Sequence, residues 1–383
     1  MKTFFAHFPA TSERPFHILA KGVKDAFVVQ ENATEKDWED LQHWINQNKG
    51  NWIFSLSSFE SSFAFLKISS IKHDVLDCPS LIWVVPEEIT IDKEFSSNFA
   101  NNHHWTFKET ITKSDYLDHL YQIHHHLKRG NFYETNYCMQ IAANGHEENP
   151  YHIWQHLFQK NPAPHAVYWQ WQEHHLLCLS PERFIQKKDN ILISQPIKGT
   201  IAKLDNQTDD LENQAKLKNS KKERSENTMI VDLVRNDMSK IAQKGSVQVK
   251  ALCDISSFHT LHHMVSTIEC LLPQSMEITD IFRALFPMGS MTGVPKKIAV
   301  TTMNELEKNE RGWYSGTCGY IEPSGNFDFN VIIRSMIYDN QKKISKIGIG
   351  SAITLQSNFE SEWDECWLKS KSLLNLASNV THR

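Results

Sequence analysis

The sequence predicts a large α+β domain built mainly from antiparallel strands. Two observations favour this class: short apolar or alternating runs recur along the chain, and a few longer segments show helical periodicity. Strands and helices do not alternate as regular βαβ units, and no glycine-rich nucleotide-binding motif is present. The length of 383 residues suits one large domain, or a catalytic domain with a smaller companion.

Composition and charge exclude several classes of protein. The formal net charge of -5 gives no electrostatic reason to expect nucleic acid or an anionic membrane as a partner. No apolar run is long enough to span a bilayer, and the N-terminus lacks the apolar core of a signal peptide. The seven cysteines are scattered and never spaced as CxxC, which argues against a disulfide framework or a zinc site. We therefore expect a cytoplasmic protein.

The N-terminal part, residues 1–105, predicts short mixed strands and loops without a recognisable chemical motif. We expect it to pack on the catalytic part of the chain. The polar stretch 96–104 is the best candidate for a boundary. Residues 106–383 are then predicted to form the catalytic domain.

The first strong helix signal follows this stretch. Thr112 or Ser114 can cap the helix, apolar residues recur on one face, and Gly130 ends it. The next segment, 132–142, alternates as a strand, and one of its faces carries a polar row that includes Glu134. A polar inner row is unusual unless that face lines a site.

The remaining elements alternate between strands and helices in an irregular order. They are predicted as strands over 166–171 and 176–179, a helical region over 207–243, strands over 315–321, 327–336 and 344–349, and a final helix over 361–376.

Two Glu-x-x-Glu units carry the clearest chemical signal. Glu223 and Glu226 begin one helical run, while Glu362 and Glu365 lie in the final helix, with Lys369 four residues further on. This spacing places each pair on one helical face. Either pair alone is more typical of a solvated helix face. Two helices that each offer two carboxylates could hold Mg²⁺, which prefers oxygen ligands and usually keeps waters and substrate oxygens in its shell.

A series of short motifs spans roughly residues 110–375. In chain order they are GNFYETN at 130–136, SPERF at 180–184, PIKGT at 196–200, ENTMIVDLVRND at 226–237, HMVS at 263–266, GSMTGVPK at 289–296, RGWYSG at 311–316, DFNVIIR at 328–334 and GIG at 348–350. Together they resemble the chorismate-utilising enzymes, a family that includes anthranilate, aminodeoxychorismate, isochorismate and salicylate synthases.

The resemblance implies a fold and a metal. The fold would be two facing antiparallel β-sheets flanked by helices, with the active site between them. The resemblance implies that Mg²⁺ is bound directly by Glu226 and Glu365. Glu223 and Glu362 match outer carboxylates that hold metal-bound water.

The resemblance also implies roles in substrate binding and catalysis. Glu182 matches the general acid of the family, and His263 matches a histidine near the departing hydroxyl. The residues expected to contact chorismate, chiefly at its enolpyruvyl carboxylate, are Thr200, Tyr314, Arg334, Gly348, Gly350 and Lys369.

Two positions distinguish the branches of the family. The aminodeoxychorismate branch has lysine at the position of Lys198, where anthranilate synthase has alanine. The isochorismate and salicylate branches have a water-activating lysine at the position of Glu134. Lysine at 198 without lysine at 134 favours conversion of chorismate and ammonia to 4-amino-4-deoxychorismate through a covalent lysine intermediate, in para-aminobenzoate and folate biosynthesis. The amine of Lys198 is nucleophilic only when neutral, so we expect the site to lower its pKa.

Glu134 is the most important departure from the family pattern, because the aminating branches usually have glutamine there. An additional carboxylate close to Lys198 would favour the charged form of the amine and so raise its pKa.

Other functions stay open at this point. Anthranilate synthase and isochorismate synthase are the nearest alternatives, and a weakly active scaffold subunit for a glutaminase is an alternative of another class. A scaffold has no need for four carboxylates, which argues against it. No glutaminase motif is evident, so the resemblance implies a separate glutamine amidotransferase subunit that supplies ammonia, and a downstream aminodeoxychorismate lyase.

Overall fold

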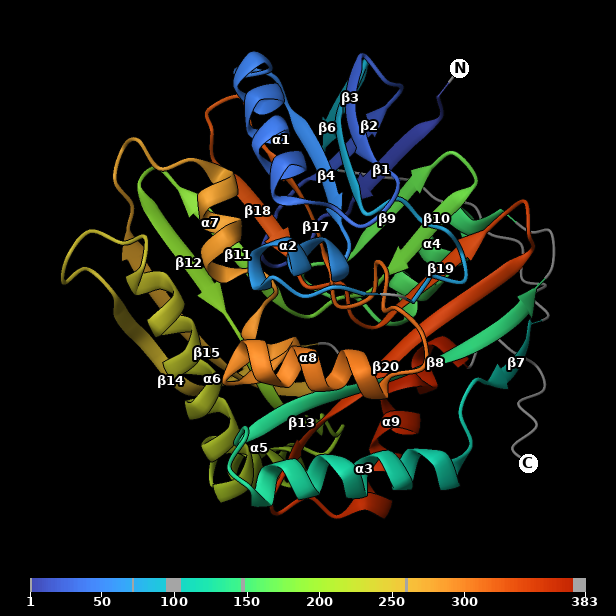
Figure 1. The fold of residues 1–383 in the computed structure, drawn as a ribbon, viewed down its shortest axis with the longest axis vertical. Helices are drawn as coiled ribbons and strands as arrows, with labels where there is room; N and C mark the ends of the chain where they lie inside the picture. The colour runs from blue at the N-terminus through green and yellow to red at the C-terminus, as the bar shows by residue number, and fades with distance from the viewer. Residues whose placement is uncertain (1, 71, 94–104, 146–148, 259–260, 375–383) are drawn as a thin grey trace.

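Two antiparallel β-sheets face each other in the computed structural model, with helices around them (Figure 1). The structure describes residues 2–70, 72–93, 105–145, 149–258 and 261–374. In this part of the chain each sheet has ten strands. Apolar side chains from both sheets form one continuous core between them. The predicted α+β class, with two facing antiparallel sheets flanked by helices, is confirmed.

The first sheet contains strands from both halves of the chain. In order across the sheet they are β16 (Gly293–Val294), β8 (Glu134–Gly145), β20 (Ile344–Thr354), β19 (Ser335–Asp339), β10 (His174–Cys178), β9 (Val167–Trp171), β1 (Phe4–Phe8), β2 (His17–Lys21) and β6 (Glu88–Asp92), with β7 (Trp105–Glu109) paired to β8.

The second sheet is assembled in the same way. Its order is β13 (Ile197–Ala202), β15 (Leu261–Leu271), β12 (Ile191–Gln195), β11 (Arg183–Lys188), β18 (Phe327–Asn330), β17 (Thr317–Ile321), β4 (Ile53–Ser57), β5 (Leu81–Val85) and β3 (Asp25–Val29), with β14 (Gln248–Ser257) paired to β15.

Helices pack against both sheets. The first sheet is contacted by α3 (Lys113–Lys128), α4 (Pro150–Lys160), α8 (Lys296–Leu306) and α9 (Phe359–Leu374). The strands β13 to β15 are contacted by α5 (Gln207–Lys218) and α6 (Lys221–Ser239). The remaining helices are α1 (Glu35–Gln47), α7 (Ile278–Leu285), the short α2 (Phe63–Leu66) and the 3₁₀ helices Glu60–Ser62 and Gly289–Met291.

Helix α3 follows directly from its sequence. The Thr112 hydroxyl caps it by accepting a hydrogen bond from the backbone N–H of Asp115. Its buried residues recur at helical spacing and face the first sheet and α9: Tyr116, Leu120, Ile123 and Leu127. Both the predicted helix and its N-terminal cap are confirmed.

Strand β8 has the predicted alternation, and its two faces enter different cores. The apolar row packs with the helices on the outer face of the first sheet: Tyr137, Met139 and Ile141. The other row faces inward and is buried: Glu134, Asn136, Cys138 and Gln140. Polar groups therefore do line the space between the sheets, as the alternation predicted.

The predicted helical region 207–243 contains two helices. The helical conformation is interrupted between α5 and α6. The Ser220 hydroxyl caps α6 by accepting a hydrogen bond from the Glu223 backbone N–H. This cap starts α6 at Lys221, so Glu223 and Glu226 lie in its first two turns. The carboxylates are thereby held at one end of the helix.

The predicted single strand over 327–336 is wrong. Residues 327–330 form β18 in the second sheet, whereas β19 begins at Ser335 in the first sheet. The chain crosses from one sheet to the other over 331–334, and Arg334 at the end of the crossing has a positive φ of 49°. Both halves of this segment are apolar and rich in β-forming residues, so their pattern does not mark the change of sheet.

A second crossing lies beside the first. Between β10 and β11 the chain passes from the first sheet to the second over 179–182. Two backbone hydrogen bonds join the crossings: Leu179 N–H donates to the Arg334 carbonyl (3.1 Å), and Val331 N–H donates to the Glu182 carbonyl (3.1 Å). Glu182 and Arg334 therefore lie on adjacent, mutually bonded segments between the sheets.

The N-terminal third contributes strands to both sheets. β1, β2 and β6 extend the first sheet, and β3, β4 and β5 extend the second. The polar stretch 96–104, predicted as a domain boundary, lies outside the described residues, so the division near residue 105 stays a prediction. Among the helices that the structure describes, none is long and apolar enough to cross a membrane.

Candidate active site between the two sheets

The paired crossings bring an acid and a cation into the space between the sheets. The Glu182 side chain is buried, and burial raises its pKa to about 7, although the Ser290 hydroxyl and the charge of Lys198 act in the opposite direction. Arg334 is half-buried and makes no ion pair within the described part of the chain, and burial lowers its pKa. An arginine without a partner in such a place can bind a carboxylate through two parallel hydrogen bonds.

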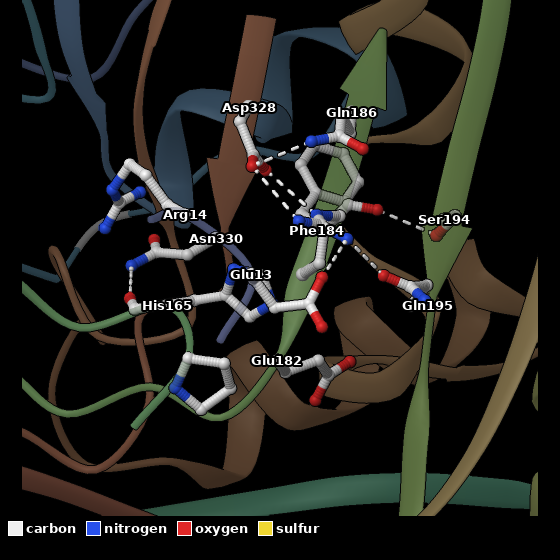
Figure 2. Close-up of polar contacts among 12 residues, drawn as sticks. Glu13, Arg14, His165, Glu182, Phe184, Gln186, Ser194, Gln195, Asp328 and Asn330 are labelled. Atoms are coloured by element: carbon white, nitrogen blue, oxygen red, sulfur yellow. Dashed lines mark hydrogen bonds and ion pairs between the residues drawn. The ribbon is translucent and has the colours of Figure 1, made fainter. Parts of the chain in front are cut away.

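The residue after Glu182 anchors this segment. Arg183 donates to both carboxylate oxygens of Asp328, at 3.0 and 3.2 Å, and also to Glu13 and Gln195. The Glu182 carboxyl points away from this network (Figure 2). Because consecutive residues of an extended chain face opposite sides, fixing Arg183 on one side holds Glu182 on the other.

Lys198 lies on a bulge at the edge of the second sheet. Two residues of β13, Lys198 and Gly199, lie opposite the single residue Met264 of β15. Gly199 has a φ of +84°, and a Cβ there would lie 2.9 Å from the Glu223 carboxylate. Such bulges re-aim side chains beside active sites. Here the bulge turns Lys198 into the protein, where its residue is only 8% exposed.

A buried ion pair joins the two sheets at this point. Lys198 Nζ in the second sheet donates a hydrogen bond of 2.6 Å to Glu134 Oε1 in the first. Burial alone would lower the pKa of Lys198, but the carboxylates of Glu134 and Glu226 outweigh it and raise this pKa. The expectation that the site lowers the pKa of Lys198 is therefore wrong for the protein without substrate, and Glu134 is the main reason.

His263 lies on β15 next to this bulge. Its Nδ1 is 2.8 Å from the Thr200 hydroxyl, and its ring is 2% exposed. Burial, together with the charge of Arg334, lowers the pKa of His263 to about 3, so the ring is neutral at ordinary pH. The predicted group of His263, Thr200 and Arg334 is thus close together in the structure, with its roles still predictions.

The glycines of β20 lie under two other predicted substrate-binding residues. A Cβ on Gly348 would lie 2.1 Å from the Tyr314 ring, so this glycine lets the ring pack on the backbone. A Cβ on Gly350 would lie 2.8 Å from the Asn136 side chain. Lys369 donates a hydrogen bond of 3.2 Å to the Gly350 carbonyl. These predicted residues therefore share the middle of β20.

The four glutamates of the predicted metal site come from α6 and α9. Glu226 and Glu362 are buried, at 6% and 2% exposed, whereas Glu223 and Glu365 are partly exposed. Burial raises the pKa of Glu226 to about 7. Among the described residues, no three histidine, cysteine, aspartate or glutamate side chains lie close enough together to hold a metal ion as they stand.

Two lysines neutralise these carboxylates in the structure. Lys222 Nζ lies 3.3 Å from Glu362 Oε1 and 4.0 Å from Glu226 Oε1, and Lys369 pairs with Glu365 at 2.7 Å. Glu226 Oε1 is buried and has no hydrogen-bond partner in the described chain. An all-oxygen donor set with such an oxygen fits Mg²⁺, provided that the lysines move aside.

Lys222 was not among the residues predicted from the sequence. The spacing in the sequence could have indicated its contact with Glu226, because Lys222 precedes Glu226 by four residues in a helix, and side chains at this spacing are neighbours. Its second partner, Glu362, lies 140 positions away in the sequence, and this contact depends on the fold.

A family model for the chorismate binding enzymes matches residues 13–375. This match covers nearly the whole chain. The chain belongs to the chorismate-binding enzymes. The predicted family is confirmed, and with it an enzyme class that uses chorismate.

Relatives in this family share substantial sequence with the chain. The chloroplastic aminodeoxychorismate synthase of Arabidopsis thaliana is 38% identical over 273 residues, 70% of this chain and 30% of that protein. Aminodeoxychorismate synthase component 1 of Escherichia coli is 34% identical over 309 residues, 80% of this chain and 66% of that protein. The Salmonella typhimurium component 1 is 35% identical over 273 residues, 71% and 60% respectively. The chain thus spans less than two thirds of each of these relatives.

Solved structures share the fold at lower sequence identity. Anthranilate synthase component I from Streptococcus pneumoniae has a TM-score of 0.83 at 20% identity, covering 95% of this chain and 93% of that one. The menaquinone-specific isochorismate synthase of Escherichia coli has a TM-score of 0.78 at 14% identity, covering 98% and 88%. These likenesses show a shared fold, and a shared fold does not by itself fix the reaction.

Proposed function

We propose that the chain is an aminodeoxychorismate synthase, which converts chorismate and ammonia to 4-amino-4-deoxychorismate. The observation that carries this proposal is the position of Lys198. A bulge turns this lysine into the interior between the sheets, where its charge acts on the buried acid Glu182. The names of the aminodeoxychorismate synthases among the relatives support the same branch.

Chorismate carries two carboxylates, and the site offers cations for them. Arg334 is half-buried between the sheets without an ion pair in the described chain. Tyr314 and Lys369 lie beside Gly348 and Gly350 in the middle of β20. We assign these three residues to the enolpyruvyl carboxylate, since a guanidinium fork matches a carboxylate and the hydroxyl and amine add donors.

In the first half of the reaction, the neutral amine of Lys198 attacks C2 of the ring. A bond forms between Nζ and C2, the ring double bonds shift, and the bond from C4 to its hydroxyl breaks. Glu182 protonates the departing hydroxyl, which leaves as water. Its pKa of about 7 keeps a large fraction of this carboxyl protonated near neutral pH.

In the second half, ammonia attacks C4 and the double bonds shift back. The bond between C2 and the lysine breaks, and Glu182 takes a proton from the new amine. One difficult displacement thereby becomes two easier ones, which is the general advantage of a covalent intermediate. The sum is chorismate plus ammonia giving aminodeoxychorismate plus water.

Mg²⁺ is part of the proposal. Glu226 and Glu365 would hold it directly, with Glu223 and Glu362 as outer partners. When bound, it would anchor the ring carboxylate and withdraw electron density from the ring. We expect Mg²⁺ to raise the melting temperature of the parent protein and to have little effect on Glu226→Gln. An equal shift in both would argue against this site.

Partners and location follow from the same proposal. The name "component 1" of the bacterial relatives indicates a second component, and we propose a glutamine amidotransferase subunit that supplies ammonia. A lyase that releases pyruvate would then give para-aminobenzoate for folate synthesis. All seven cysteines are buried and unpaired, which supports a reducing compartment such as the cytoplasm.

The decisive experiment is a product assay with chorismate, Mg²⁺ and ammonium, resolved by chromatography and mass spectrometry. We expect aminodeoxychorismate from the parent protein and none from Lys198→Ala. A matched control is Lys203→Ala, because Lys203 is an exposed lysine at the end of the same segment. Anthranilate or isochorismate as the product would overturn the proposed branch.

The covalent step has its own measurement. Without ammonium, the parent protein should accumulate an adduct whose mass exceeds that of the protein by one chorismate less one water. Peptide mapping should place it on Lys198. Formation of product without an adduct on Lys198, under single turnover, would rule out the lysine intermediate while leaving the overall reaction in place.

A further inference from the structure

Glu134 holds the nucleophile proposed above, although its residue type departs from the family pattern. Its Oε1 accepts the 2.6 Å hydrogen bond from Lys198 Nζ, and the residue is 1% exposed. Its other oxygen, Oε2, is also buried and has no hydrogen-bond partner among the described residues. This carboxylate is therefore bonded through one oxygen only, to the atom that has to react.

Lys198 cannot attack in the state that the structure shows. Three carboxyl groups surround its amine: Glu134 from β8, Glu226 from α6 and Glu182 from the crossing before β11. Their combined charge favours the ammonium form, whose nitrogen has no lone pair to offer. Lys198 and Glu134 are both buried, so a neighbouring side chain is the nearest acceptor for the proton.

The three carboxyl groups are not equivalent as acceptors of that proton. Glu182 has to keep its own proton for the departing hydroxyl, so it cannot also take one from the lysine in the same step. Glu226 is assigned above to the metal. Glu134 is the member of this group that already accepts a hydrogen bond from Nζ, and a candidate base has to be within such reach of the proton it abstracts.

We propose that Glu134 is the general base that takes the proton from Lys198 as its amine attacks the ring; this inference rests on the proposed lysine intermediate. The proton moves from Nζ to Glu134 Oε1 while the bond from Nζ to C2 forms. Glu182 gives its proton to the hydroxyl that leaves C4. In the second half, the lysine departs as a neutral amine and recovers its proton from Glu134, and Glu182 takes the proton of the new amine. Every group returns to its starting state.

The orphaned oxygen of Glu134 suits this role. Hydrogen bonds donated to a carboxylate stabilise its charged form and make it a weaker base. Glu307, a buried carboxylate elsewhere in the molecule, accepts hydrogen bonds at both oxygens from Arg311 and the Cys138 N–H. Among the described residues Glu134 accepts a hydrogen bond at Oε1 only, and no donor occupies its Oε2.

The test is the rate of adduct formation in Glu134→Gln, measured by rapid quench and intact mass without ammonium. Omitting ammonium removes its own titration from the pH profile. Glutamine has the same shape but cannot accept the proton, so we expect the rate at neutral pH to fall by about 10²- to 10⁴-fold. Below about pH 7, where Glu182 still holds its proton, the rate in the variant should rise by about tenfold per pH unit, because Lys198 has to lose its proton before it attacks, and the parent should lack this rise.

A second variant separates chemistry from structure. In Glu134→Ala the side chain is removed, and added formate, a small carboxylate, should restore part of the adduct rate while acetamide should not. A merely structural role would show no such rescue. Circular dichroism of each variant checks the fold.

The outcomes distinguish this inference from the proposed function. Glu134→Gln with the parental rate and pH profile would overturn the role of Glu134 and leave the lysine intermediate standing. Absence of any adduct in the parent protein, with product still formed in Lys198→Ala, would overturn the lysine intermediate, on which this inference rests, and leave the overall reaction in place. Slow adduct formation in Glu134→Gln, together with an adduct on Lys198 in the parent protein, would support both the role of Glu134 and the lysine intermediate.

Discussion

Two buried ion pairs of this molecule differ in how completely their hydrogen bonds are made. In the pair of Arg311 and Glu307, Arg311 donates twice to Glu307 and also to the carbonyls of Met291 and Asn136. In the other pair, Lys198 and Glu134 share one hydrogen bond of 2.6 Å, and Glu134 Oε2 has no hydrogen-bond partner in the described chain.

The difference indicates what each pair is for. A buried charge is costly unless its remaining polar atoms are hydrogen-bonded, so the saturated pair is suited to holding the fold. In the incompletely bonded pair, Glu134 Oε2 can still accept a hydrogen bond from a ligand or bind a proton. Substitutions in the first region should therefore change stability, and substitutions in the second should change the rate.

The largest expected effect is on the rate, in the incompletely bonded region. Glu182→Gln removes the proposed proton donor, and we expect kcat to fall by about 10²- to 10⁴-fold, measured as aminodeoxychorismate formation. Because Glu182 acts in its protonated form, the parental rate should fall as the pH rises through about 7, and the variant should lose this dependence. Glu212→Gln, at an exposed position of α5, is the matched control. Equal losses in both variants would contradict the assignment.

The next effect tests the saturated pair. Arg311→Met leaves Glu307 as a buried charge without its partner, and we expect the free energy of unfolding to fall by about 3–5 kcal/mol in urea titrations. Glu134→Gln should stay within about 1 kcal/mol of the parent, because the amide oxygen can still accept a hydrogen bond from Lys198. Similar losses in the two variants would break the comparison between the pairs.

A smaller effect tests the packing on β20. Gly348→Ala would place a Cβ 2.1 Å from the Tyr314 ring, and we expect overpacking to cost about 1–3 kcal/mol in unfolding free energy. In a Tyr314→Ala background the same substitution should cost little, since the ring is gone. A double-mutant cycle measures this coupling. Additive losses would show that the ring is not the obstacle.

The smallest effect concerns Lys222, which pairs with Glu362 and has a side chain that is 40% exposed. If Mg²⁺ has to displace this lysine, Lys222→Met should lower the Mg²⁺ concentration for half-maximal activity. Partly exposed pairs contribute up to about 1 kcal/mol, so the change should be at most about fivefold. Lys221→Met, one residue earlier at an exposed position, is the control. A higher Mg²⁺ requirement in Lys222→Met would mean that the lysine assists the site.

Much of the fold follows from local sequence signals. The helix after Thr112 has its cap and its apolar face in the sequence, and the inward polar row containing Glu134 follows from period-two alternation. The facing sheets and the roles of the glutamates came from the family resemblance. The helix and the strand alternation can be predicted from short segments, and the facing sheets and the roles of the glutamates from motifs that occur in the order typical of the family.

Other features depend on contacts between distant segments, and the sequence did not predict them. The change of sheet at 331–334 lies inside a continuous β-rich run, so periodicity gives no sign of it. The bulge at Lys198 and Gly199 depends on the register between β13 and β15. The sequence indicated that Glu134 would raise the pKa of Lys198, but the contributions of Glu226 and Glu182, which come from two other elements, depend on the fold.

The two hydrogen bonds between the crossings have a mechanical consequence. Glu182 and Arg334 lie on two of the segments that pass from one sheet to the other, so these backbone bonds hold the acid and the arginine at a fixed spacing. Lys198 and Glu134 lie instead on β13 and β8, near the edges of the two sheets (Figure 1). A change in the spacing of the sheets at these edges would therefore act on the hydrogen bond between lysine and glutamate, whereas the spacing between acid and arginine is held by the backbone.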